Sequence, residues 1–202
     1  LFQVRQAKVR IVPNGVDSRF AAADAQLFQA RFGNNSFVLC PGRIEPRKNQ
    51  LTLIRALRGT GLRLVLLGDV VSGHDRYLSA CRAAADDSVL FLGRVQHDDP
   101  LLASAYAACR CVALASWYET PSLAALEAAL TGAPLVLPAG GSAREYFGPL
   151  ARYVAPHNLT EIRAAVLAAI AEPRSSSLAS LVSGQFTWRN VAEATWAAYD
   201  AL

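Results

Sequence analysis

The 202-residue chain has no methionine, two lysines, and no apolar run near the roughly 20 residues of a membrane-spanning helix. The first residues also lack the apolar core of a signal peptide. These absences predict a chain without a transmembrane or secretory segment. Charged residues are few, 18% against 52% hydrophobic residues, which excludes an intrinsically disordered chain. Because the chain does not begin with Met, we expect a piece of a longer protein.

No group of residues is spaced as metal ligands usually are. The four cysteines include Cys109-x-Cys111, which is not a usual metal spacing, so we expect buried free thiols in a reducing, cytoplasmic compartment. His74, His97 and His157 are far apart and fall in predicted loops or helix starts, where exposed side chains are expected. The sequence therefore offers no candidate metal site.

The positive charge is scattered along the chain. The net charge is +4, and arginine makes up 18 of the 20 basic residues. Nucleic-acid tails carry runs of basic residues, and none is present, so we expect no nucleic-acid partner. A modest positive balance suits a small anionic ligand.

Strands and helices alternate at about 25-residue intervals. The expected strands cover residues 8–12, 37–42, 62–69, 88–93, 111–116, 134–141 and 151–155. The expected helices cover residues 24–32, 50–57, 74–85, 100–109, 121–131, 142–147, 158–171, part of 173–184, and 188–201. Strands that are apolar on both faces favour a parallel sheet with helices on each side. The predicted fold is therefore α/β and Rossmann-like, with residues 1–202 forming a single domain.

Polar loops follow most of these strands. Ligands of such sheets bind at the carboxyl ends of the strands, so the loops after them should form one rim. One loop, GRIEPRKN at 42–49, holds Arg43, Arg47 and Lys48, which suit a diphosphate or form a solvated basic loop. Glycines at this rim would let backbone N–H groups approach an anion, or would simply serve strand-end turns.

Two acids frame the segment that follows the 111–116 strand. Glu119 lies in a predicted loop; Pro121 suits the first helical position, with Thr120 or Ser122 as the cap. Leu123, Leu126 and Leu130 form an apolar stripe, and Glu127 lies beside it. A buried carboxylate needs a polar partner, so Glu127 either forms a buried salt bridge, reaches water from the edge of the stripe, or meets another polar group.

Several strings together resemble the C-terminal domain of family 4 (group 1) glycosyltransferases. They are PNGVD (13–17), GRIEPRKN (42–49), VLLGD (65–69), FLGRV (91–95), SWYETPSLAALEAALTGAPLV (116–136) and GG (140–141) before Glu145. The resemblance runs from about Lys8 to the end of the chain, and the Glu119-x7-Glu127 spacing is its most specific part. It implies one Rossmann-like half of a GT-B fold, with a last helix at 189–202 that packs toward a missing N-terminal domain.

The resemblance implies a role for each matched position. Arg43 and Lys48 would bind and neutralise the diphosphate of a nucleotide sugar, and Glu127 would bind its ribose hydroxyls. Glu119 would contact the donor sugar, either as a catalytic group or only as a binding group. The implied catalytic residues are Glu119, Arg43 and Lys48. The implied donor-binding residues are Gly42, Arg43, Lys48, Gly93, Arg94, Val95, Glu119, Thr120, Pro121, Ser122, Leu123 and Glu127. Thr120 and Arg144 depart from the family pattern, which puts the sugar pocket and the loop before Glu145 in question.

The implied function is sugar transfer with retained configuration from a nucleoside-diphosphate sugar, as in polysaccharide biosynthesis. The resemblance also implies that the transfer needs no metal and no other cofactor. The acceptor, a sugar or a lipid-linked glycan, would bind the missing domain, so the isolated chain would not turn over. A lipid acceptor would place the protein at the inner membrane face. The alternatives are a nucleotide-sugar epimerase of the same fold and a non-catalytic domain that binds a nucleotide or a partner protein.

Overall fold

The computed structural model describes residues 9–120 and 122–200 and is built on one six-stranded parallel sheet. The strand order is β3-β2-β1-β4-β5-β6, the order of a Rossmann fold. The strands are β1 (Phe37–Pro41), β2 (Arg63–Leu67), β3 (Val89–Gly93), β4 (Cys111–Ala113), β5 (Leu135–Pro138) and β6 (Arg152–Val154). The predicted α/β class with a parallel, Rossmann-like sheet is confirmed.

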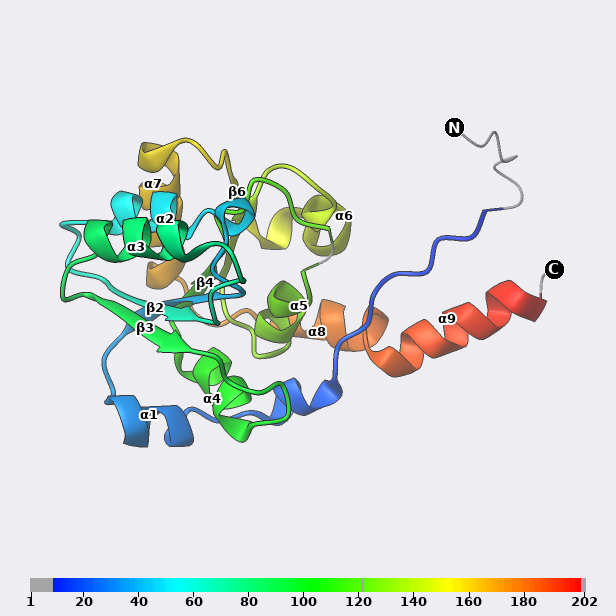
Figure 1. Cartoon of the computed structure of the whole chain (residues 1–202). Coiled ribbons are helices and arrows are strands. Elements are labelled where there is room, and N and C mark those ends of the chain that lie inside the picture. The colour runs from blue at the N-terminus through cyan, green and yellow to red at the C-terminus, as the bar shows by residue number, and fades with distance from the viewer. Residues whose placement is uncertain (1–8, 121, 201–202) are drawn as a thin grey trace.

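Helices cover both faces of the sheet (Figure 1). One face carries α2 (Gln50–Leu57), α3 (Asp75–Ala84) and α7 (Leu159–Ala171). The other carries α1 (Gln26–Phe32), α4 (Pro100–Ala108), α5 (Leu123–Leu130) and α8 (Ser176–Gln185), with the 3-10 helix η2 (Ser18–Ala22) against α5 and α8. The remaining elements are η3 (Pro46–Lys48), α6 (Ala143–Phe147), η4 (Gly148–Leu150) and α9 (Trp188–Asp200).

The central strands are buried on both faces, as their apolar runs require. All five residues of β1 are buried, and β1 pairs with β2 from Phe37↔Arg63 to Pro41↔Leu67. Full burial of one Leu or Val side chain stabilises a fold by about 1.5–3 kcal/mol. The sheet therefore holds the loops at its carboxyl edge on a rigid base.

The expected strand at 8–12 is wrong. Residues 9–12 have no regular structure, Ile11 is exposed, and Lys8 lies outside the described residues. The six strands of the described sheet pair with one another, and none of them pairs with residues 9–12. Strand-like pairing is found four residues later, where Val16 forms an isolated β-bridge with Thr187.

The helix expected at 121–131 begins two residues later, at Leu123. Ser122 is its N-cap residue, but its side chain makes no capping hydrogen bond, and Pro121 lies outside the described residues. Leu123 is 43% exposed and does not belong to the buried stripe. Because Ala125–Leu130 are all buried, α5 is enclosed almost all round and the stripe pattern does not describe it.

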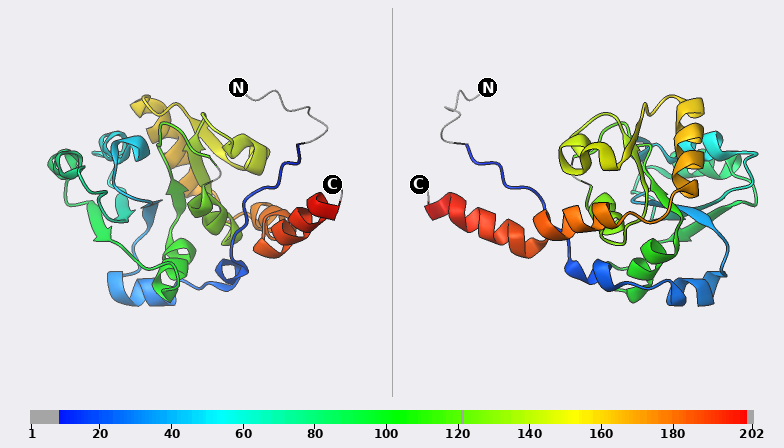
Figure 2. Two further views of the ribbon diagram at one scale, coloured as in Figure 1. Left: turned by 45° about the vertical axis from the view of Figure 1, so that its right-hand side comes forward. Right: turned by 180° about the vertical axis from the view of Figure 1, so that it is seen from behind.

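The helix α9 points away from the sheet, on the same side as the extended segment after residue 9 (Figures 1 and 2). Val191 is its one buried residue in the described chain, while Trp188, Trp196 and Tyr199 are exposed. In the ranges 9–120 and 122–200, no helix combines the length and the apolar character needed to cross a bilayer.

Candidate functional site

The polar loops gather at the carboxyl edge of the sheet, as predicted. The strand order reverses between β1 and β4, and ligands of open α/β sheets bind at such a switch point. A cleft of about 820 Å³ lies beside it, over the ends of β1 and β2 and against α4 and α5. Its lining includes Gly42, Arg43, Asp69, Arg94, Val95, His97, Tyr106, Leu123 and Glu127.

Glu127 forms the acidic wall of this cleft. Its side chain is 8% exposed, yet both carboxylate oxygens have partners. The Tyr106 hydroxyl donates to Oε2 at 2.7 Å, and His97 Nε2 lies 3.0 Å from Oε1. Burial raises the pKa of Glu127 above its usual value, and the two hydrogen bonds oppose that rise. The buried acid therefore has polar partners, as predicted: the Tyr106 hydroxyl and the His97 imidazole.

Lys48 and Glu119 form a buried ion pair next to the cleft. The Lys48 ammonium donates to Glu119 Oε1 at 2.6 Å, and the Ser116 hydroxyl donates to the same oxygen at 2.5 Å. The two charged side chains are 15% and 6% exposed. Both hydrogen bonds fall on one carboxylate oxygen, so the described side chains leave Oε2 to other partners.

The basic loop divides its charges between two tasks. Arg43 lines the cleft, and its side chain is 68% exposed. Arg47 braces the loop, since its guanidinium donates to Glu45 at 2.9 Å and to the Tyr118 carbonyl at 3.3 Å. Arg43 Nη2 lies farther from the same Glu45 oxygen, at 3.6 Å. Arg94, from the loop after β3, adds a second guanidinium to the cleft lining.

Two glycines permit close backbone contacts at the rim. A Cβ on Gly68 would lie 2.2 Å from the Gly42 carbonyl oxygen, and one on Gly141 would lie 1.9 Å from that of Glu119. Gly68 and Gly141 also have positive φ angles of 151° and 96°. Gly141 pairs with Glu119 as an isolated bridge, so the α6 loop holds the Glu119 backbone.

Asn49 connects the basic loop to two strand ends. It is the one non-glycine residue of the described chain with a positive φ, 55°, a conformation that Asn tolerates well. Its side-chain amide donates to the carbonyls of Ala115 and Pro156, at 2.9 and 2.8 Å. The orientation of Lys48, one residue earlier, is thereby tied to the loops after β4 and β6.

The structure separates the expected donor-binding residues into two groups. Those that line the cleft are Gly42, Arg43, Arg94, Val95, Leu123 and Glu127. Those that lie beside it are Lys48, Gly93, Glu119, Thr120 and Ser122, with Pro121 outside the described residues. Their individual roles stay predictions.

Sequence reasoning missed four residues that organise the site. His97, Tyr106, Ser116 and Asn49 contact Glu127, Glu119 or the strand ends. The burial of an acid in an apolar helix indicated that a partner existed but did not identify it. His97 was expected only to be exposed; its side chain is 63% exposed, yet its ring reaches Glu127.

The described ranges contain no group of three His, Cys, Asp or Glu side chains placed to bind a metal ion. The expectation that the protein needs no metal stays a prediction. The Cys40 and Cys109 thiols are buried, and burial raises the pKa of each to about 12.

Comparisons with known proteins agree on one family. The profile of the family Glycosyl transferases group 1 matches residues 35–172. D-inositol 3-phosphate glycosyltransferase of Stackebrandtia nassauensis is 33% identical, over 100% of this chain and 51% of the relative. A GDP-mannose-dependent alpha-(1-6)-phosphatidylinositol monomannoside mannosyltransferase of Mycobacterium tuberculosis is 33% identical, over 69% of this chain and 40% of the relative.

Solved structures show the same fold at lower identity. Anabaena Alr3699/HepE, in complex with UDP and glucose, superposes with a TM-score of 0.86 at 23% identity, over 99% of this chain and 59% of that one. Sucrose-phosphate synthase of Thermosynechococcus elongatus gives 0.83 at 22% identity, over 95% and 52%. The chain spans about half the length of these relatives. With its profile match, its relatives and its Rossmann-like half of a GT-B fold, the chain belongs to the group 1 glycosyltransferase family.

Proposed function

We propose that the full-length protein is a retaining glycosyltransferase and that this chain is its donor-binding half. One observation carries the proposal: a single cleft at the switch point joins the exposed cation Arg43 to the buried carboxylate Glu127. A nucleoside-diphosphate sugar offers a diphosphate for the first and a ribose diol for the second. The Anabaena relative, whose structure contains UDP and glucose, supports this choice of ligand class.

Arg43 and Lys48 bind the diphosphate in this proposal. A lysine ammonium has three N–H donors, and the Glu119 contact uses one, so two remain for phosphate oxygens. Arg43 adds a planar fork that suits a phosphate group. These cations, with Arg94, stabilise the departing diphosphate without a metal, and losing one such contact is expected to raise the barrier by about 3 kcal/mol.

Glu119 binds a hydroxyl of the donor sugar through Oε2, since its other oxygen is held by Lys48 and Ser116. A carboxylate fixed in a buried ion pair is a weak nucleophile. We therefore assign Glu119 to binding, and the transfer to front-face attack by the acceptor without a covalent intermediate. The nucleoside base rests against the Gly93–Val95 segment.

The acceptor, a sugar or a lipid-linked glycan, binds the other half of the protein, and a lipid acceptor would bring the enzyme to the inner membrane face. The exposed face of α9 supports a second half. Trp188, Trp196 and Tyr199 recur at helical spacing on a helix that extends from the domain (Figure 2). Because the relatives are about twice as long as this chain, we assign this apolar face to contact with that half.

The test is calorimetric titration of the full-length protein with UDP, GDP and ADP. We expect one of the three to bind, and Arg43→Ala and Glu127→Ala each to weaken it at least tenfold. Arg31→Ala is the matched control, since Arg31 is an exposed arginine in α1, at the opposite edge of the sheet. It should bind like the parent.

The same titration on the 202-residue chain separates binding from turnover. We expect the chain to bind the same diphosphate more weakly and to transfer no sugar. Failure of all three nucleotides to bind the full-length protein would refute the donor-binding role. Turnover by the isolated chain would refute the need for the second half.

A further inference from the structure

The described side chains occupy only part of the hydrogen-bonding capacity of the Glu127 carboxylate. A carboxylate accepts about four hydrogen bonds, two on each oxygen. Tyr106 takes one position on Oε2, and His97 takes one on Oε1. One position remains on each oxygen, which is the number that a vicinal diol with two hydroxyl donors needs.

The proton on His97 can be assigned from its other contact. His97 Nδ1 lies 3.1 Å from Arg19 Nη2, and a guanidinium is always a donor. A contact with a guanidinium favours an accepting Nδ1, and therefore the tautomer whose N–H is on Nε2 and faces Glu127 Oε1. Arg19 also donates to the His97 carbonyl, and the Phe20 ring meets the imidazole edge-on at 5.8 Å between centroids.

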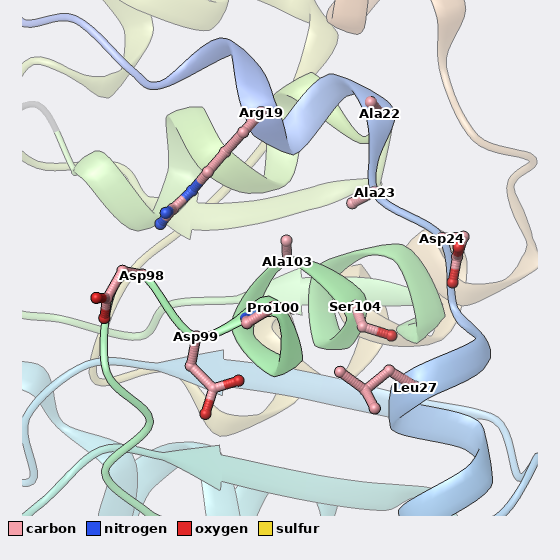
Figure 3. A pocket seen from close by; sticks show the side chains of 10 residues that line it. All are labelled: Arg19, Ala22, Ala23, Asp24, Leu27, Asp98, Asp99, Pro100, Ala103 and Ser104. Carbon is pink, nitrogen blue, oxygen red and sulfur yellow. The ribbon is translucent and has the colours of Figure 1, made fainter.

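Arg19 is directed to this contact and not to a separate site. Figure 3 shows it extending from η2 toward the segment that carries Asp98, beside a second hollow of about 340 Å³. The hollow's other acids already have helix-end contacts, because Asp24 accepts from the Gln26 N–H and Asp99 from the Leu101 N–H. The arginine thus links the N-terminal segment of the chain to the cleft.

We propose that His97 is a positioning residue for the donor's ribose. Its ring holds the Glu127 carboxylate in the one rotation in which it accepts hydrogen bonds from both ribose hydroxyls. Tyr106 alone would hold one oxygen and leave the carboxylate free to turn about its terminal bond. His97 holds the second oxygen while its exposed ring lines the cleft. This inference rests on the proposed function, because it needs a nucleotide in this cleft.

The test compares ribose with deoxyribose nucleotides on the full-length protein. UDP, GDP and ADP are titrated first, and the one that binds is compared with its 2′-deoxy and 3′-deoxy forms. A hydrogen bond to a charged group predicts about a tenfold or greater preference of the parent protein for the ribose form. In His97→Ala we expect that preference to fall to about threefold or less, with little change for the deoxy forms.

Two further variants separate positioning from folding. His97→Gln keeps an N–H donor for Glu127 and should recover most of the ribose preference. His157→Ala, at an exposed histidine outside the cleft lining, should leave the preference unchanged. If His97→Ala weakens the binding of both forms by the same factor, so that the preference stays intact, or if His97→Gln fails to recover a lost preference, the positioning role is wrong. If no diphosphate binds the parent protein, the proposed function fails and this inference fails with it.

Discussion

Replacing Lys48 with Met should separate the stabilising role of the Lys48–Glu119 pair from its role in the site. The variant keeps a side chain of similar length but leaves the Glu119 carboxylate, 6% exposed, with Ser116 as its remaining partner among the described residues. Removing one member of a buried ion pair typically costs 3–5 kcal/mol. Because Lys48 is 15% exposed, we expect the lower end, about 3 kcal/mol.

The matched control is the double variant Lys48→Met/Glu119→Gln. It removes both charges, and the amide carbonyl that it introduces in place of the carboxylate still accepts from Ser116, so it should recover about 2 kcal/mol of the loss. A cost of 3 kcal/mol lowers the melting temperature of a domain of this size by about 6–12 °C. Urea unfolding followed by far-UV circular dichroism measures the double variant and the single variants Lys48→Met and Glu119→Gln against the parent.

Stability and binding should then diverge. The double variant regains stability but not nucleotide binding, because both groups that we assign to the donor are gone. Additive effects of Lys48→Met and Glu119→Gln on the free energy of unfolding would show that the two charges are not coupled. An unchanged stability of Lys48→Met would refute the reasoning from burial.

Three other changes have defined outcomes. Gly141 and Gly73 both have a positive φ, 96° and 82°, but only at Gly141 would an added Cβ meet the Glu119 carbonyl. Thermal unfolding should therefore show Gly141→Ala to be less stable than Gly73→Ala by about 1–3 kcal/mol. Equal losses of stability would contradict the steric argument. Burial raises the pKa of Glu127, so the folded state binds the carboxyl proton more tightly than the unfolded state does. The stability that this proton provides at low pH is lost as the pH rises from the unfolded-state pKa to the folded-state pKa. Glu127→Gln should therefore gain melting temperature relative to the parent as the pH rises above about 4.3, the ordinary pKa of a glutamate in an unfolded chain, while parallel pH curves would exclude this role. The buried thiols should resist iodoacetamide at pH 8 in the folded protein and react in denaturant, as read by mass spectrometry; rapid reaction of the folded protein would contradict their burial. These thiols are Cys40, Cys81, Cys109 and Cys111.

The strands were predictable because each forms a continuous apolar run, although the edge strand β3, expected to be buried, is only half-buried. The runs at 37–42, 62–69 and 88–93 each contain the observed strand within two residues of its ends. The 8–12 segment has the same β-branched character but no strand beside it in the sheet. A strand needs a partner, and the sequence of the segment itself does not contain that information.

The site was predictable only where its residues share one segment. Glu119 lies in the loop before α5 and Glu127 within that helix, so one short segment indicated both a rim position and a buried acid. Their partners come from elsewhere, because Lys48 is 71 residues from Glu119 and His97 is 30 residues from Glu127. Such pairs form through the order of the strands, and they leave no periodic pattern in the chain.

The tryptophans of this chain all lie at its surface, so its intrinsic fluorescence responds to changes at the surface. Trp117, Trp188 and Trp196 are at least half exposed, and they are the chain's three tryptophans. Trp117 is two residues from Glu119 at the rim, and the other two are on α9. Intrinsic fluorescence of this chain therefore reports on the rim and on α9, and is insensitive to the packing of the sheet. A shift of its emission on joining to the other half would mark docking of α9, while a shift with nucleotide would mark the rim.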